Sequence, residues 1–285
     1  MPVAEACFKL AAYLTCVGIA LEFAHRLYWQ LNKRVYDLEI SVVSRIILSS
    51  SVATIPLISA VIITTGFIRY VDKRSISTLG LAYTGDSLTS IAYGASIGLG
   101  CVSFAFLTGI LMGYIEIRRS RLADDYVSHL PLFIGGIIDF FAGSVFEEVI
   151  FRGYVFFLLY EAGGAHLAIV GSSVVFALAH VLKHPSTPLM YALNAFIFGI
   201  IAATARHFTG ALWLPVGLHF GWNVVSGPIF GLPMCGKSYE RGMVVSEVSG
   251  PEWLTGGNHS LDAGFLGTVA LTLATVGLIA IVPLK

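Results

Sequence analysis

Polar side chains that could perform acid–base chemistry lie inside apolar stretches of this sequence. The first group is in FEEVIFRG, residues 146–153, which contains Glu147, Glu148 and Arg152. A charge at the centre of a membrane-spanning helix is unfavourable by about 2.5–3.5 kcal/mol on insertion scales, so these three residues need compensating contacts. On an α-helix Glu148 and Arg152 are four residues apart and can form an ion pair. Glu147 then points about 100° away and has no local partner.

Two further apolar stretches carry histidines. VGSSVVFALAH ends at His180, four residues after Phe176, and LWLPVGLHFGWNVV contains His219 and Asn223. His219 and Asn223 are also four apart, so on a helix they project into the same volume. Taken alone, each of these residues more often makes a hydrogen bond between helices than performs chemistry.

As a set, these residues have a more specific meaning. One carboxylate, two imidazoles and one carboxamide can activate a water molecule and stabilise a developing oxyanion. Ser144 is close to the glutamates, but no G-x-S-x-G surrounds it, so a serine nucleophile is not indicated. The set therefore predicts hydrolysis by an activated water, provided that the three stretches meet.

Composition predicts that these residues are held by membrane helices. The chain has 285 residues, of which 56% are hydrophobic and 12% charged, and its mean hydropathy is +0.82. This profile is typical of a polytopic helical membrane protein. The 17 basic residues balance 17 acidic ones, so no basic surface for nucleic acid is indicated. The four cysteines contain no CxxC pair and suggest neither a disulfide framework nor a zinc knuckle.

The pattern predicts an all-α bundle of about eight membrane helices around a polar cavity, forming a single membrane domain over residues 1–285. A spanning helix needs about 20 mostly apolar residues. The expected segments are 4–24, 46–68, 88–115, 131–160, 166–181, 187–206, 211–231 and 263–284.

Three motifs resemble those of a known family. EEVIFRG is similar to an EExxxR signature, FALAH to FxxxH and HFGWN to HxxxN, in the order found in the CPBP family of type II CAAX prenyl endopeptidases and Abi proteins. The resemblance covers residues 130–230, which are expected to be the catalytic core. It implies an intramembrane protease with an all-helical fold, whose substrate is a membrane-associated peptide or protein, prenylated and CAAX-type in some relatives.

The resemblance also implies roles for individual residues. Glu147 would be the base that activates water, with His180 assisting it, while His219 and Asn223 would stabilise the oxyanion. The supporting residues would be Glu148, Arg152 and Phe176. No cofactor is expected, since a base-activated water needs no ion and the sequence lacks HExxH. The alternative is a zinc-dependent protease with Glu147, His180 and His219 as metal ligands.

Two other classes of function compete with a protease. Proton-coupled transport also places Glu, His and Arg in a bundle, but neither an inverted repeat nor paired broken helices are evident. A non-catalytic membrane scaffold or immunity protein, a role of some relatives, is the other alternative. In every case the bilayer is an expected partner, and we expect an integral, multi-pass protein of a bacterial or archaeal cell membrane.

Overall fold

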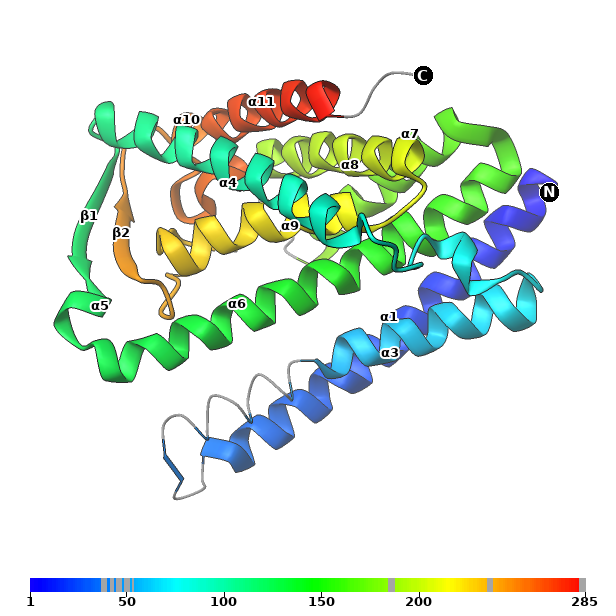
Figure 1. Ribbon diagram of the computed structural model, residues 1–285, viewed down its shortest axis with the longest axis horizontal. Coiled ribbons are helices and arrows are strands. Elements are labelled where there is room, and N and C mark those ends of the chain that lie inside the picture. Colours follow the sequence, from blue (N-terminus) through cyan, green and yellow to red (C-terminus); the bar gives the residue numbers. More distant parts are fainter. Residues whose placement is uncertain are drawn as a thin grey trace.

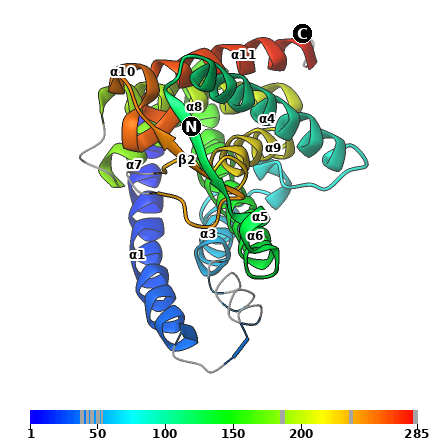
Figure 2. The same ribbon diagram turned by 90° about the vertical axis from the view of Figure 1, so that its left-hand side faces the viewer.

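The computed structural model describes residues 1–36, 54–183, 188–234 and 238–281, together with residues 40, 41, 44, 48 and 52. Its main helices form a bundle, shown in Figures 1 and 2. They are α1 (Val3–Tyr36), α3 (Ile55–Gly66), α4 (Ser87–Leu111), α6 (Tyr126–Glu148), α7 (Phe156–Lys183), α8 (Leu189–Thr209), α9 (Trp213–Val224) and α11 (Phe265–Ile281). The shorter elements are η1 (Phe67–Val71), η2 (Ile76–Leu79), β1 (Ile115–Ser120), α5 (Arg121–Asp124), η3 (Val149–Val155), η4 (Val225–Ile229), β2 (Val244–Val248), α10 (Glu252–Thr255) and η5 (Gly257–Ala263).

The expected all-α membrane bundle is confirmed. Within the described residues, five helical stretches are long and apolar enough to cross a membrane, and the shorter apolar stretch Ile55–Val71 adds to them. One of the five, His129–Leu182, contains both the 131–160 and the 166–181 segments. They are separated where Gly164 adopts a left-handed backbone with φ of 76°. The beginning of the 46–68 segment lies largely outside the described residues.

The expected end of the third span, residue 115, is wrong, because a small β-sheet begins there. The third span was expected to extend to residue 115, but α4 ends at Leu111 and Gly113 then takes a left-handed φ of 74°. Ile115 begins strand β1, which pairs antiparallel with β2 from the distant segment after η4. Figure 1 shows both strands together at one end of the bundle. The hydrophobicity of residues 112–115 continued the apolar pattern, whereas the glycine turn ended the helix.

Glycines bring α9 very close to α4. A Cβ placed on Gly98 of α4 would lie 2.6 Å from the carbonyl oxygen of Leu218, and one placed on Gly94 would lie 2.6 Å from the backbone nitrogen of the same residue. The reciprocal positions on α9, Gly217 and Gly221, would likewise collide with the backbone of α4. Small residues of this kind allow membrane helices to approach through their backbones. This contact sets the position of the helix that carries His219.

We expect Gly98→Val to destabilise the protein, because the obstacle is backbone and cannot rotate away. Overpacking of this kind costs about 1–3 kcal/mol or more. Gly100→Val is the matched control on the same helix, since no atom lies within 4 Å of its added Cβ. Thermal unfolding in detergent should show a lower midpoint for Gly98→Val alone. Equal midpoints for the two variants would contradict the proposed packing.

A polar network attaches the first helix to the segment that carries Arg152. The Lys9 ammonium of α1 lies 2.9 Å from Oδ1 of Asp72. The Tyr154 hydroxyl, in η3, donates to Oδ2 of the same carboxylate at 2.8 Å. The Tyr13 ring packs against Tyr154 with the ring centroids 4.3 Å apart. Helix α1 and Asp72, the residue that follows η1, therefore hold η3 in place through Tyr154.

Candidate active site

The two glutamates lie at a change of helix type. Helix α6 ends with Glu147 and Glu148, and the next seven residues form the π-helix η3, which contains Arg152. The α-helical geometry expected across FEEVIFRG is therefore wrong after Glu148. Single π-helical turns within helices occur frequently at functional sites, since the wider turn reorients neighbouring side chains.

Glu148 and Arg152 form the expected pair. The Arg152 guanidinium donates from Nη1 to Oε1 of Glu148 at 3.1 Å, and both side chains are completely buried. The guanidinium carbon also lies 4.2 Å from the centroid of the Phe176 ring, a distance at which the ring face attracts a cation. Phe176 therefore contacts the ion pair itself, a more specific position than general packing.

Glu148 has a second partner that spacing could not show. Its Oε1 also lies 2.9 Å from Nδ1 of His219, which is 71 residues away in sequence. If the carboxylate is ionised, it can only accept a hydrogen bond, so Nδ1 of His219 carries the proton. The Nε2 atom of His219 then faces the other way, toward Glu147. Glu148 thus connects Arg152 to the histidine of α9.

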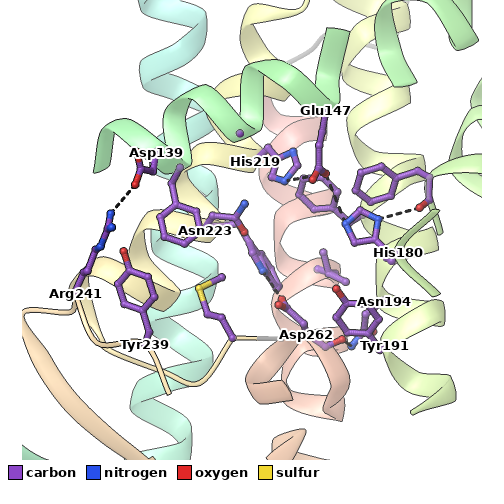
Figure 3. Close-up of a pocket in the computed structure, with 18 of the residues that line it drawn as sticks. Asp139, Glu147, His180, Tyr191, Asn194, His219, Asn223, Tyr239, Arg241 and Asp262 are labelled. Atoms are coloured by element: carbon purple, nitrogen blue, oxygen red, sulfur yellow. Dashed lines mark hydrogen bonds and ion pairs between the residues drawn. The ribbon is translucent and has the colours of Figure 1, made fainter. Parts of the chain in front are cut away.

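Glu147 lies between the two histidines (Figure 3). Its Oε2 is 3.6 Å from Nε2 of His180 and 3.8 Å from Nε2 of His219. The Nδ1 atom of His180 is 2.9 Å from the Phe176 carbonyl oxygen, which again assigns a proton to Nδ1. The separations to Glu147 exceed those of a hydrogen bond. A water molecule beside Glu147 would therefore be within reach of the carboxylate and both imidazoles.

These groups line a cavity of about 460 Å³, and Asn223 lines it as well. The structure thus brings together all four residues expected to act on a substrate, from α6, α7 and α9. Glu147 is about one quarter exposed and His219 is largely buried. The walls are mostly apolar and carry a limited number of polar groups, a combination typical of small-molecule and substrate sites.

Sequence reasoning missed other polar residues of the cavity. Asp139 of α6 forms an ion pair with Arg241, Oδ2 to Nη1, at 2.6 Å. Tyr239 lies beside them in Figure 3, and burial raises the pKa of its hydroxyl to about 12. Asn194 and Asp262 line the same cavity. Asn194 could have been found as a polar residue in an apolar span, whereas Asp262 follows a loop and carries no motif.

The zinc-dependent alternative requires that Glu147, His180 and His219 lie at the spacing of zinc ligands. Glu147, His180 and His219 converge, but the described residues contain no group of three or more His, Cys, Asp or Glu side chains arranged to hold a metal ion. Ligands about 2.0–2.2 Å from one tetrahedral zinc lie about 3.3–3.6 Å apart, and the separations of 3.6 and 3.8 Å from Glu147 Oε2 are at or just above the upper end of that range. The zinc-dependent alternative therefore stays a prediction.

Comparisons with known proteins agree with the motifs. Residues 129–225 match the family model described as type II CAAX prenyl endopeptidase Rce1-like. The chain is also 31% identical over 109 residues to the "Putative membrane peptidase YdiL" of Bacillus subtilis (strain 168). This match covers 38% of the chain and 41% of the relative, so the chain spans about two fifths of that protein's length. No solved structure matches with statistical significance.

The matched segment coincides with the site. Residues 129–225 contain Glu147, Glu148, Arg152, Phe176, His180, His219 and Asn223. The helical spans on either side make the chain an integral, multi-pass membrane protein. Residues 129–225, which contain all three motifs, are therefore similar to the type II CAAX prenyl endopeptidase Rce1-like family, in agreement with the resemblance of those motifs.

Proposed function

We propose that this protein is an intramembrane endopeptidase that hydrolyses a peptide bond of a membrane-associated substrate. The observation that carries the proposal is the convergence of Glu147 Oε2 with Nε2 of both His180 and His219 in a cavity inside an apolar bundle. Ionisable groups placed this way within a membrane protein are functional candidates by default. The family match of residues 129–225 supports the same reaction class.

In the proposed reaction, Glu147 accepts a proton from water, and His180 assists by holding that water. The water oxygen bonds to the carbonyl carbon of the substrate, whose oxygen becomes an oxyanion. When the carbon–nitrogen bond breaks, Glu147 returns the proton to the leaving amine. The same carboxylate thus acts first as base and then as acid.

His219 and Asn223 are proposed to stabilise the oxyanion. The Asn223 carboxamide donates from its NH₂ group in any protonation state. His219 already uses Nδ1 toward Glu148, so Nε2 can donate only when the ring carries both protons. Glu148 is therefore proposed to be a positioning residue that orients the His219 ring through Nδ1.

The test is cleavage by the purified protein in detergent. Three substrates are offered to wild type and to Glu147→Ala: a prenylated C-terminal CAAX-type peptide, its unprenylated counterpart and a membrane-spanning peptide. We expect mass spectrometry to show cleavage of at least one substrate by wild type alone, and the comparison identifies the substrate class. If a folded wild type cleaves none of them, the scaffold or immunity alternative is favoured over the protease.

We further propose that the reaction needs no metal. Chelation with 1,10-phenanthroline should leave cleavage unchanged, because Glu147 can take the proton of water without an ion. Elemental analysis of the purified protein should find far less than one zinc per chain. Stoichiometric zinc that is removed together with activity, and restores activity when it is returned, would establish the zinc-dependent alternative with Glu147, His180 and His219 as ligands.

A further inference from the structure

The acidic side chains that line the cavity outnumber the basic ones within the described residues. Three acids, Asp139, Glu147 and Asp262, and one base, Arg241, line it within the described residues. Arg241 is engaged by Asp139 at 2.6 Å. Glu147 faces the two imidazoles. Asp262 is thus the carboxylate of this wall for which the described residues provide no Lys or Arg partner.

Asp262 is held rigidly. Its Oδ1 accepts a hydrogen bond from Nε1 of Trp222 at 2.8 Å, and its backbone carbonyl accepts one from Nδ2 of Asn194 at 3.1 Å. Asn194 is itself fixed, because its Oδ1 accepts from the Thr268 hydroxyl at 2.8 Å. Among the described residues no donor is directed at Oδ2 of Asp262, so one oxygen of a well-anchored carboxylate remains available to the cavity.

Asp262 lies near the residues that are proposed to act on the substrate. Trp222, which holds it, directly precedes Asn223 on α9. Its carboxylate is also close enough to His180, His219 and His259 for their charges to interact. Figure 3 shows Asp262 below Glu147, with Asn223 on the left and His180 on the right at intermediate heights. A peptide bond placed at Glu147 would therefore have its neighbouring side chains within reach of Asp262.

We propose that Asp262 is a specificity-determining residue that binds a cationic side chain, lysine or arginine, of the substrate close to the cleaved bond. This inference rests on the proposed protease function and names the class of peptide that the site prefers. A carboxylate that has no Lys or Arg partner and lies in a mostly apolar cavity is poorly screened, so it favours a positive partner more strongly than one at the protein surface. The aliphatic stem of lysine or arginine suits the surrounding apolar wall.

The proposal is tested by binding, so that its outcome does not depend on cleavage. The protein is Glu147→Gln in detergent, in which the acids left in the described lining are Asp139, which pairs with Arg241, and Asp262. The probes are fluorescein-labelled apolar peptides with one Lys, and matched peptides with Gln or Glu at the same position, moved along the chain. We expect at least one Lys position to bind on the order of tenfold more tightly than Gln, and Glu to bind more weakly than Gln.

Variants of Asp262 test whether its carboxylate causes the preference for Lys peptides. Adding Asp262→Asn keeps an oxygen acceptor for Trp222 and should abolish the preference for Lys, whereas Asp262→Glu, which retains the charge, should keep it. Glu252→Gln is the matched control, an exposed acid of α10 outside the cavity, and should keep the preference too. Thermal unfolding verifies that each variant is folded.

The results separate the two proposals. Equal binding of Lys and Gln peptides at every position, or a Lys preference that survives Asp262→Asn, would overturn the role of Asp262 even if wild type cleaves peptides. A Lys preference that depends on Asp262, in a wild-type protein that cleaves nothing, would retain the binding site and reject the protease.

Discussion

Glu147→Gln is expected to lower kcat for peptide cleavage by about 10²–10⁴-fold, the range that a positioned general base contributes. The amide has nearly the shape of the carboxylate but cannot accept the proton of water. Because the side chain is about one quarter exposed and faces the cavity, its neutralisation should leave the fold intact. Substrate affinity should change much less than kcat, since the lost interaction is made in the transition state.

The control for this substitution is Glu161→Gln. Glu161 is a glutamate of α7 that pairs with Arg74 at 2.9 Å and is partly exposed, away from the cavity. Its neutralisation removes the same charge and should leave cleavage within about twofold of wild type, because exposed ion pairs contribute little. Steady-state kinetics on a peptide that the wild type cleaves measure kcat and KM for both variants. Full activity in Glu147→Gln would reject Glu147 as the base.

Glu148→Ala should have the largest effect on stability. It leaves the Arg152 guanidinium buried without its carboxylate, and breaking a buried pair in this way costs about 3–5 kcal/mol. It also releases Nδ1 of His219, so cleavage should fall together with the unfolding midpoint. Unfolding in detergent and cleavage of the surviving folded protein are the two measurements.

A double variant separates these two effects. Glu148→Met with Arg152→Met removes both charges and fills much of their volume, a change that is often neutral or stabilising for buried pairs. We expect it to recover most of the stability lost in Glu148→Ala. Cleavage should remain low, because His219 still lacks the carboxylate that orients its ring. Recovery of cleavage along with stability would show that Glu148 serves the fold alone.

Spacing predicted only part of the Glu148 interactions. The pair with Arg152 follows from four residues of helical separation, and it is present even though η3 is π-helical. The contact with His219 depends on where α9 lies against α6. That placement follows from the glycine contacts with α4, which no periodicity in FEEVIFRG can encode.

The cavity residues were likewise predicted only in part from the sequence. His180, His219 and Asn223 stood out because polar groups are rare in apolar spans. Arg241 was missed because it lies outside the apolar segments, where a charge is ordinary. Asp139 lies inside α6 and could have been found by the same signal as Glu147. Asp262 was missed because its partner, Trp222, is 40 residues away. Such pairs are recognisable only once the helices that carry them are packed together.

The sequence by itself therefore determined the class of the protein, an all-α membrane bundle, and the set of side chains available for hydrolysis. These features depend on composition and on contacts within one helix, both of which are local. Only the tertiary structure decided that Glu147 lies between two Nε2 atoms, that Glu148 holds His219, and that Asp262 faces the same cavity. The physical reason is that these contacts join side chains from different helices, whose relative positions are set by backbone packing across the bundle.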